Sequence, residues 1–79
     1  MRSDDMLFWT RAAPFRPFRV FLNSGRSYEI RHPELLRIGR TSMIFFSVRG
    51  GPDDPYDRAE MVSLVLIERI EPIETPAAA

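Results

Sequence analysis

The clearest structural signal in the chain is FRVFLNSGRSYEIR, residues 18–31. Side chains alternate between two faces in both halves: Phe18, Val20, Leu22, Tyr28 and Ile30 form one apolar face, and Phe21 lies with the polar residues on the other. Alternation with a period of two indicates a β-strand with one buried face. The Asn-Ser-Gly sequence at 23–25 favours a tight reversal, because glycine accepts a positive φ angle at no steric cost. The stretch therefore predicts an antiparallel β-hairpin.

Further β-prone segments follow the hairpin. His32-Pro33-Glu34 should break the second strand, since proline cannot donate to a strand ladder, and Leu35–Gly39 begins a new extended segment. After a turn, Met43–Arg49 carries apolar side chains on both faces, which is typical of a strand buried on both sides. The glycine, proline and aspartate residues at 50–55 predict a flexible loop.

The closing stretch Ala59–Ile73 does not keep one period. It alternates at first, loses alternation over Leu64–Ile67 and resumes it afterwards. A strand, a single helical turn and a short final strand explain this change of phase. Together these segments predict a mainly β fold, a five-stranded, strongly bent antiparallel small barrel at 18–73. Its expected core is Val20, Leu22, Tyr28, Ile30, Ile44, Phe46, Leu64 and Ile70.

Upstream of the barrel, residues 1–13 predict a short helix. Ser3 is a candidate N-cap, and the acidic residues Asp4 and Asp5 complement the positive helix start. The run Met6–Trp9 covers about 300° of a helix, which is wider than a stripe that faces a single core. One side of this helix should therefore pack on the barrel, and the other side needs a different cover.

The whole chain, 1–79, is expected to be one domain. The helix at 1–13 leads through an extended, proline-rich connector at 14–17 into the barrel, and a flexible tail occupies 74–79. A chain of 79 residues buries a thin core, and oligomerisation is a common supplement to such a core. The absence of cysteine excludes disulfides and zinc–thiolate sites. No apolar run reaches the length of a membrane span or a signal peptide, so a cytoplasmic location without a membrane partner is expected.

Candidates for catalysis are few. His32 could act as a base near Glu29 or Glu34, but a turn histidine that satisfies local backbone groups explains it better. The aspartates at 53, 54 and 57 lack the spacing of a calcium loop and fit a solvated acidic loop. We therefore expect neither an enzyme nor a bound cofactor or metal.

Charge is segregated along the chain although the formal net charge is zero. All eleven basic residues are arginine; residues 1–50 carry a net charge of +5 and residues 51–79 a net charge of −5. Cross-strand ion pairing explains this segregation, and a basic face opposite an acidic face is the alternative. In the alternative, arginines would neutralise phosphates while an exposed Phe21 stacks on bases, and the candidate contacts are Arg16, Arg19, Arg26 and Arg31.

Four short motifs resemble a group of small uncharacterised bacterial proteins. They are the Pro-Phe-x-Pro-Phe connector at Pro14–Phe18, Gly25-Arg26, the Tyr-Glu-x-x-His-Pro-Glu-Leu segment at Tyr28–Leu35, and Ile70–Pro72. The resemblance covers roughly residues 8–73 and supports the fold, but that group has no established activity. The order of elements also resembles Sm-like and Src-homology-3-like small barrels.

The Sm resemblance rests on Leu22–Arg26, which is similar to the turn of the first Sm motif. The residues with which that family holds uridine are missing downstream, so no RNA-binding residue is carried over. We therefore expect a non-catalytic interaction module that self-associates, as a dimer or ring, through its helix and barrel edges, or that binds another protein. The candidate interface is Met6, Leu7, Phe8, Trp9 and Phe21. Binding of RNA or another single-stranded nucleic acid is the alternative function.

Overall fold

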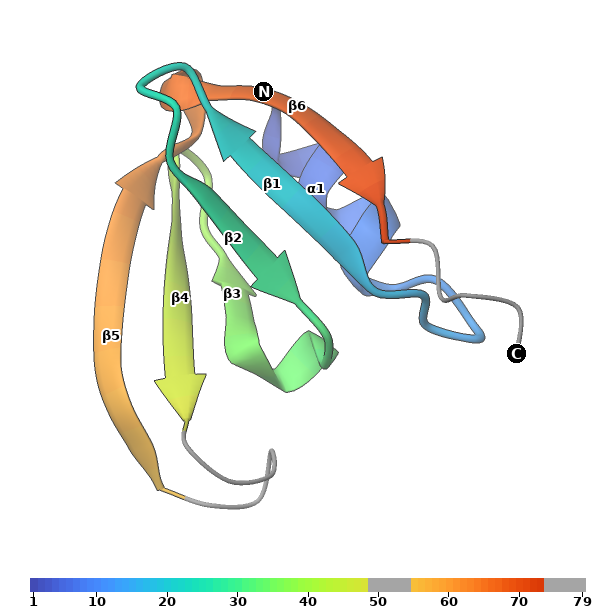
Figure 1. Ribbon diagram of the computed structural model, residues 1–79. Helices are drawn as coiled ribbons and strands as arrows, with labels where there is room; N and C mark the ends of the chain where they lie inside the picture. The colour runs from blue at the N-terminus through green and yellow to red at the C-terminus, as the bar shows by residue number, and fades with distance from the viewer. Residues whose placement is uncertain (49–54, 74–79) are drawn as a thin grey trace.

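The computed structural model describes residues 1–48 and 55–73 (Figure 1). Along the chain the elements are α1 (Ser3–Thr10), β1 (Phe18–Leu22), β2 (Ser27–Ile30), the 3-10 turn η1 (Pro33–Leu35), β3 (Leu36–Ile38), β4 (Ser42–Val48), β5 (Tyr56–Ser63), the 3-10 turn η2 (Leu64–Leu66) and β6 (Ile67–Pro72). The loop and tail expected at 50–55 and 74–79 lie, except for Pro55, outside the described residues.

The predicted hairpin is confirmed. β1 and β2 pair antiparallel, with Val20 opposite Tyr28. Gly25 has a φ angle of 98°, in the left-handed region that disfavours side chains, and its N–H donates to the Leu22 carbonyl oxygen at 3.0 Å. The apolar residues of both strands are buried, as the alternation in the sequence predicts.

The mainly β fold behind an N-terminal helix is also confirmed, but the strands number six and form two three-stranded antiparallel sheets. The order is β2-β1-β6 in one sheet and β3-β4-β5 in the other, so the described strands do not close into a barrel. Pro33 lies where the chain passes from one sheet to the other. It begins the 3-10 turn that separates β2, which pairs with β1, from β3, which pairs with β4. The strand break expected at His32-Pro33-Glu34 is thus confirmed, and the segments on its two sides belong to different sheets (Figure 1).

The change of phase near the C-terminus has the predicted cause. β5 ends at Ser63, one 3-10 turn covers Leu64–Leu66, and β6 begins at Ile67. The turn joins the two sheets through backbone hydrogen bonds: the Leu64 N–H donates to Thr41 at 2.9 Å, and the Asn23 N–H donates to Leu66 at 2.9 Å.

Helix α1 is shorter than the expected 1–13. Arg2, not Ser3, is its N-cap, and the Arg2 backbone N–H donates to the Asp5 carboxylate at 3.2 Å. The helix ends at Thr10, well before the Ala13–Pro14 peptide bond, which is cis. It lies against β1 and β3, behind the first sheet in Figure 1.

The core fills the space between the two sheets and α1. Five of the eight expected core residues are buried: Val20, Leu22, Tyr28, Ile30 and Leu64. Their buried partners are Met6, Phe18, Leu36, Met43, Val62 and Ile67. The other three expected residues, Ile44, Phe46 and Ile70, are only partly buried.

The expected core is wrong in β4 because the opposite face of the strand is the buried one. Met43 is fully buried and Phe45 packs against the core, whereas Ile44 and Phe46 lie on the opposite face of the strand. Both faces of β4 are apolar, so the sequence carries no periodic signal that identifies the inner one. The observed burial makes Met43 the anchor of the second sheet.

Truncation of Met43 should therefore destabilise the fold more than truncation of Phe46. Met43→Ala is expected to cost about 2–5 kcal/mol of unfolding free energy, because it leaves a cavity in the core. Phe46→Ala should cost less than half of that amount. Urea unfolding followed by Trp9 fluorescence measures both, and equal losses would contradict the observed phase of β4.

Candidate interaction surface

Two side chains anchor α1 to the core. Met6 is fully buried, and the Trp9 ring lies 5.4 Å from that of Phe18 on β1. Residues three apart share one face of a helix, so these contacts determine which side of α1 points inward. Met6 was a candidate interface residue, and its burial within its own chain removes it from that set. Trp9 is partly buried and faces inward for most of its surface.

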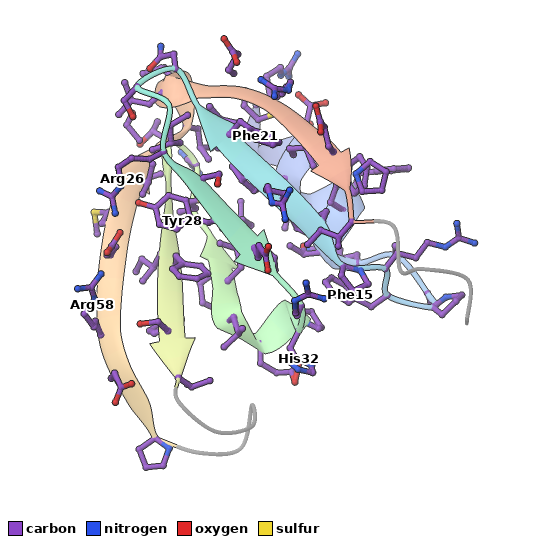
Figure 2. All side chains as sticks on the ribbon, viewed as in Figure 1. Phe15, Phe21, Arg26, Tyr28, His32 and Arg58 are labelled. Carbon is purple, nitrogen blue, oxygen red and sulfur yellow. The ribbon has the colours of Figure 1, made fainter. Side chains whose placement is uncertain are left out.

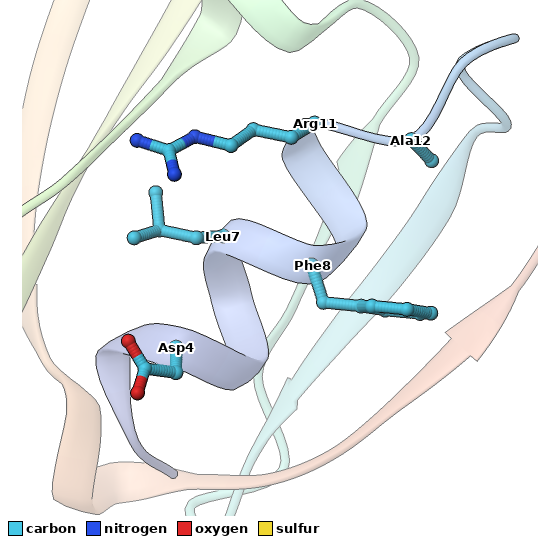
Figure 3. Close-up of a pocket in the computed structure, with 5 residues that line it drawn as sticks. All are labelled: Asp4, Leu7, Phe8, Arg11 and Ala12. Atoms are coloured by element: carbon cyan, nitrogen blue, oxygen red, sulfur yellow. The ribbon is translucent and has the colours of Figure 1, made fainter.

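The outer side of α1 carries a shallow pocket. It is lined by Asp4, Leu7, Phe8, Arg11 and Ala12, which we call the helix surface (Figure 3). Phe8 is 74% exposed, the second most exposed large apolar side chain among the described residues. Its ring meets that of Trp9 edge-on at 6.3 Å. Of the predicted interface on the helix, Phe8 and the partly buried Leu7 are thus available to a partner.

Phe21, the remaining interface candidate, does not present a free ring. The Arg69 guanidinium on β6 lies 3.9 Å from the Phe21 ring centre, within the range of a cation–π contact. Arg69 is held in place by Glu68 and Glu71, each at 2.7 Å. Figure 2 shows Phe21 on β1, apart from the labelled group around Tyr28. Arg69 thus occupies one face of the ring, which leaves less of Phe21 open to stack on a base.

Three of the four arginines proposed to contact nucleic acid are paired with carboxylates. Arg19 and Arg31 both contact Glu29, the first as a cross-strand pair between β1 and β2. Arg26 contacts Glu60 at 3.2 Å. Arg16 is exposed and forms no ion pair within 1–48 or 55–73. Of these pairs, only Arg26–Glu60 joins the basic first half of the sequence to the acidic second half, so cross-strand pairing explains little of the charge segregation.

A second charged cluster connects the two sheets. The Tyr28 hydroxyl on β2 donates to the Glu60 carboxylate on β5 at 2.7 Å, and Arg26 and Arg58 contact the same carboxylate (Figure 2). Burial and the hydrogen bond to Glu60 raise the pKa of the Tyr28 phenol. The same hydrogen bond, aided by both arginines, lowers the pKa of Glu60. Tyr28 and Arg26 thus connect the β1–β2 hairpin to β5, whereas Arg58 and Glu60 both lie on β5.

Sequence reasoning missed an apolar corner where β5 meets η2. Met61 and Val65 are 71% and 76% exposed, and Leu66 is exposed as well. The loss of alternation over Leu64–Ile67 was its only signal. Asp4 and Arg11 were also missed as parts of the helix surface, although their spacing from Phe8 places all three on one helix face.

The residues considered for catalysis and for calcium binding lie at separate places in the fold. His32 is exposed between β2 and η1, and Figure 2 shows it at the far end of β2, away from the Tyr28 cluster. Residues 53 and 54 lie outside the described part of the chain, while Asp57 belongs to β5. Within the described residues, no three carboxylate or histidine side chains are grouped as a metal site would require.

The Tyr28–Glu60 contact predicts a pH dependence. The raised pKa of Tyr28 means that the folded state favours the neutral phenol, whose ordinary pKa is 10.0. This stabilisation is complete below about pH 10 and is lost as the pH rises through the folded-state pKa. In a Tyr56→Phe background, an absorbance titration should place Tyr28 above about pH 10, and Glu60→Gln should lower that midpoint. Part of the shift should persist, because burial is unchanged; a midpoint that Glu60→Gln does not move would contradict the contact.

Comparison with known proteins identifies no relative of this chain. No protein-family model, curated protein or solved structure matches the chain. No helix in the described residues is long and apolar enough to span a bilayer. A functional conclusion therefore depends on the surfaces of the molecule itself.

Proposed function

We propose that this protein is a non-catalytic interaction module that self-associates through its N-terminal helix and the edges of its sheets. The observation that carries the proposal is the contrast within α1, where Met6 is fully buried and Phe8 is 74% exposed. A phenylalanine on the outer side of a short helix is costly in water, and a partner that covers it recovers the free energy of burial. The non-catalytic assignment rests on a sequence with one histidine and neither cysteine nor lysine.

The sheet edges support the same proposal. In the described residues, β5 pairs only with β4 and β6 pairs only with β1, so each has one lateral edge without a strand partner. β5 spans eight residues and is the longest strand. Exposed edges pair readily with strands of other chains, and natural proteins limit this with charged side chains. β5 carries the charged residues Asp57, Arg58 and Glu60, of which Arg58 and Glu60 pair with each other, so this edge has the kind of side chains that limit unselective pairing.

The alternative, binding of RNA or other single-stranded nucleic acid, has less support. It needs arginines free to neutralise phosphates and rings free to stack on bases. Arg19, Arg26 and Arg31 are paired with carboxylates, and Arg69 occupies one face of the Phe21 ring. Retention on an immobilised oligonucleotide that weakens as salt rises would favour this alternative over self-association.

Self-association should depend on Phe8 and not on an equally exposed apolar residue elsewhere. Sedimentation of the full chain from about 10 μM to about 1 mM should show a mass that rises above 9.2 kDa. Phe8→Ser should weaken association about tenfold, since it removes most of the apolar area on the helix surface. Val65→Ser is the matched control, because Val65 is 76% exposed on η2, and it should leave the association unchanged. A monomer over the whole range would overturn the proposal.

A further inference from the structure

We propose that two copies of this chain join by packing their α1 helices antiparallel, with Asp4 of each copy facing Arg11 of the other. This contact rests on the self-association proposed above and assigns it to one surface and one orientation. Its basis is the arrangement of charge and apolar area on the helix surface.

The helix surface has an apolar centre with one charge at each end. Asp4, Leu7 and Arg11 extend to one side of this pocket and Phe8 extends to the other, so that together they flank it (Figure 3). Phe8 is four residues from Asp4 and three from Arg11, which places it between the two charges on the helix. The outer side of α1 is therefore negative near its start, apolar in the middle and positive just beyond its end.

These two charges have no ion-pair partner in the part of the chain that the structure describes. Neither Asp4 nor Arg11 forms an ion pair with any residue in 1–48 or 55–73. Seven residues of helix separate them by about 10 Å along the axis, too far for them to pair with each other. The point midway between them falls between Leu7 and Phe8. The pattern is consequently symmetric about the apolar centre, with charges of opposite sign.

A surface of this kind complements itself under a two-fold rotation. When two copies meet antiparallel, Asp4 of each faces Arg11 of the other, and the Leu7 and Phe8 side chains meet at the centre. An interface in which residue i contacts j and j contacts i is the usual basis of a closed homodimer. Parallel packing would instead place Asp4 against Asp4 and Arg11 against Arg11. Charge complementarity therefore selects a second copy of this chain, in one orientation, as the occupant.

The size of α1 sets the strength of the contact. Eight residues of helix are about 12 Å long, which offers much less than the roughly 800 Å² per partner of a standard interface. We expect a weak dimer that exchanges rapidly and forms at high protein concentration. Asp4 and Arg11 also interact favourably with the dipole of their own helix, so a substitution at either position can change helix stability. An experiment must therefore separate the effect on pairing between copies from the effect on the helix.

Charge reversal at Asp4 in one copy and at Arg11 in the other tests the pairing between copies. Asp4→Arg and Arg11→Asp, introduced separately into the full chain, should each weaken homodimerisation about tenfold or more, because two attractive contacts become two repulsive ones. An equimolar mixture of the two variants should form a heterodimer with roughly the wild-type affinity, since opposite charges then meet at both ends. Sedimentation velocity with one variant fluorescently labelled measures both quantities.

Controls separate pairing from folding. Charge reversal at either helix end opposes the helix dipole, so circular dichroism and thermal unfolding of each variant must show the native fold. Asp4→Asn and Arg11→Gln remove the attraction without adding repulsion, and each should weaken the dimer by a smaller factor than the reversal. These neutral variants keep the test valid if a reversal does not fold.

The outcomes distinguish this contact from self-association in general. If the wild-type chain associates but neither reversal nor neutralisation changes its affinity, the antiparallel helix contact is wrong and the sheet edges account for the association. If the reversals weaken the dimer and their mixture does not restore it, the pairing of Asp4 with Arg11 is wrong. A wild-type chain that stays monomeric to about 1 mM would overturn both the contact and the proposed function.

Discussion

The insertion of Met6 and Trp9 into the core orients α1, and the surface of the molecule depends on that orientation. Two three-stranded sheets enclose a core of eleven buried residues, which accommodates only one side of the helix. With Met6 fully buried and Trp9 against Phe18, helical geometry directs Phe8 outward. A thin core thus leaves a large aromatic side chain in solvent, and this links the small size of the fold to association between copies.

Many charged side chains, unlike the exposed residues of α1, form contacts between neighbouring strands. Glu29 bridges Arg19 and Arg31 beside the hairpin, and Glu60 accepts from Tyr28 across the two sheets. Exposed pairs of this kind contribute little stability individually, and they add favourable contacts between strands that backbone pairing and the core already hold together. They also neutralise arginines that would otherwise attract phosphate. By contrast, Asp4 and Arg11 on α1 lack such a pair within the described residues, which leaves their charges available to a partner.

Local sequence patterns predicted the local structure well. The alternation over 18–31 and Gly25 predicted the hairpin, and the lost alternation near Leu64 predicted the 3-10 turn. The errors concern positions where the pattern is degenerate. Four consecutive apolar residues from Met6 onward do not reveal which one is buried, and β4 is apolar on both faces, so Phe46 and Met43 exchanged roles. The division of the strands between two sheets and the Tyr28–Glu60 contact depend on residues far apart in the chain. The periodicity of a segment carries no information about such contacts.

The central claim is that the outer side of α1 is where copies of this chain meet. Amide chemical shifts of the full chain, compared by NMR between about 20 μM and about 1 mM, test this claim without any substitution. The account predicts concentration-dependent shifts at Asp4, Phe8 and Arg11, while the amides of Tyr28 and Met43 stay constant. Spectra in which the α1 amides do not move with concentration, or in which only the strand edges move, would contradict it.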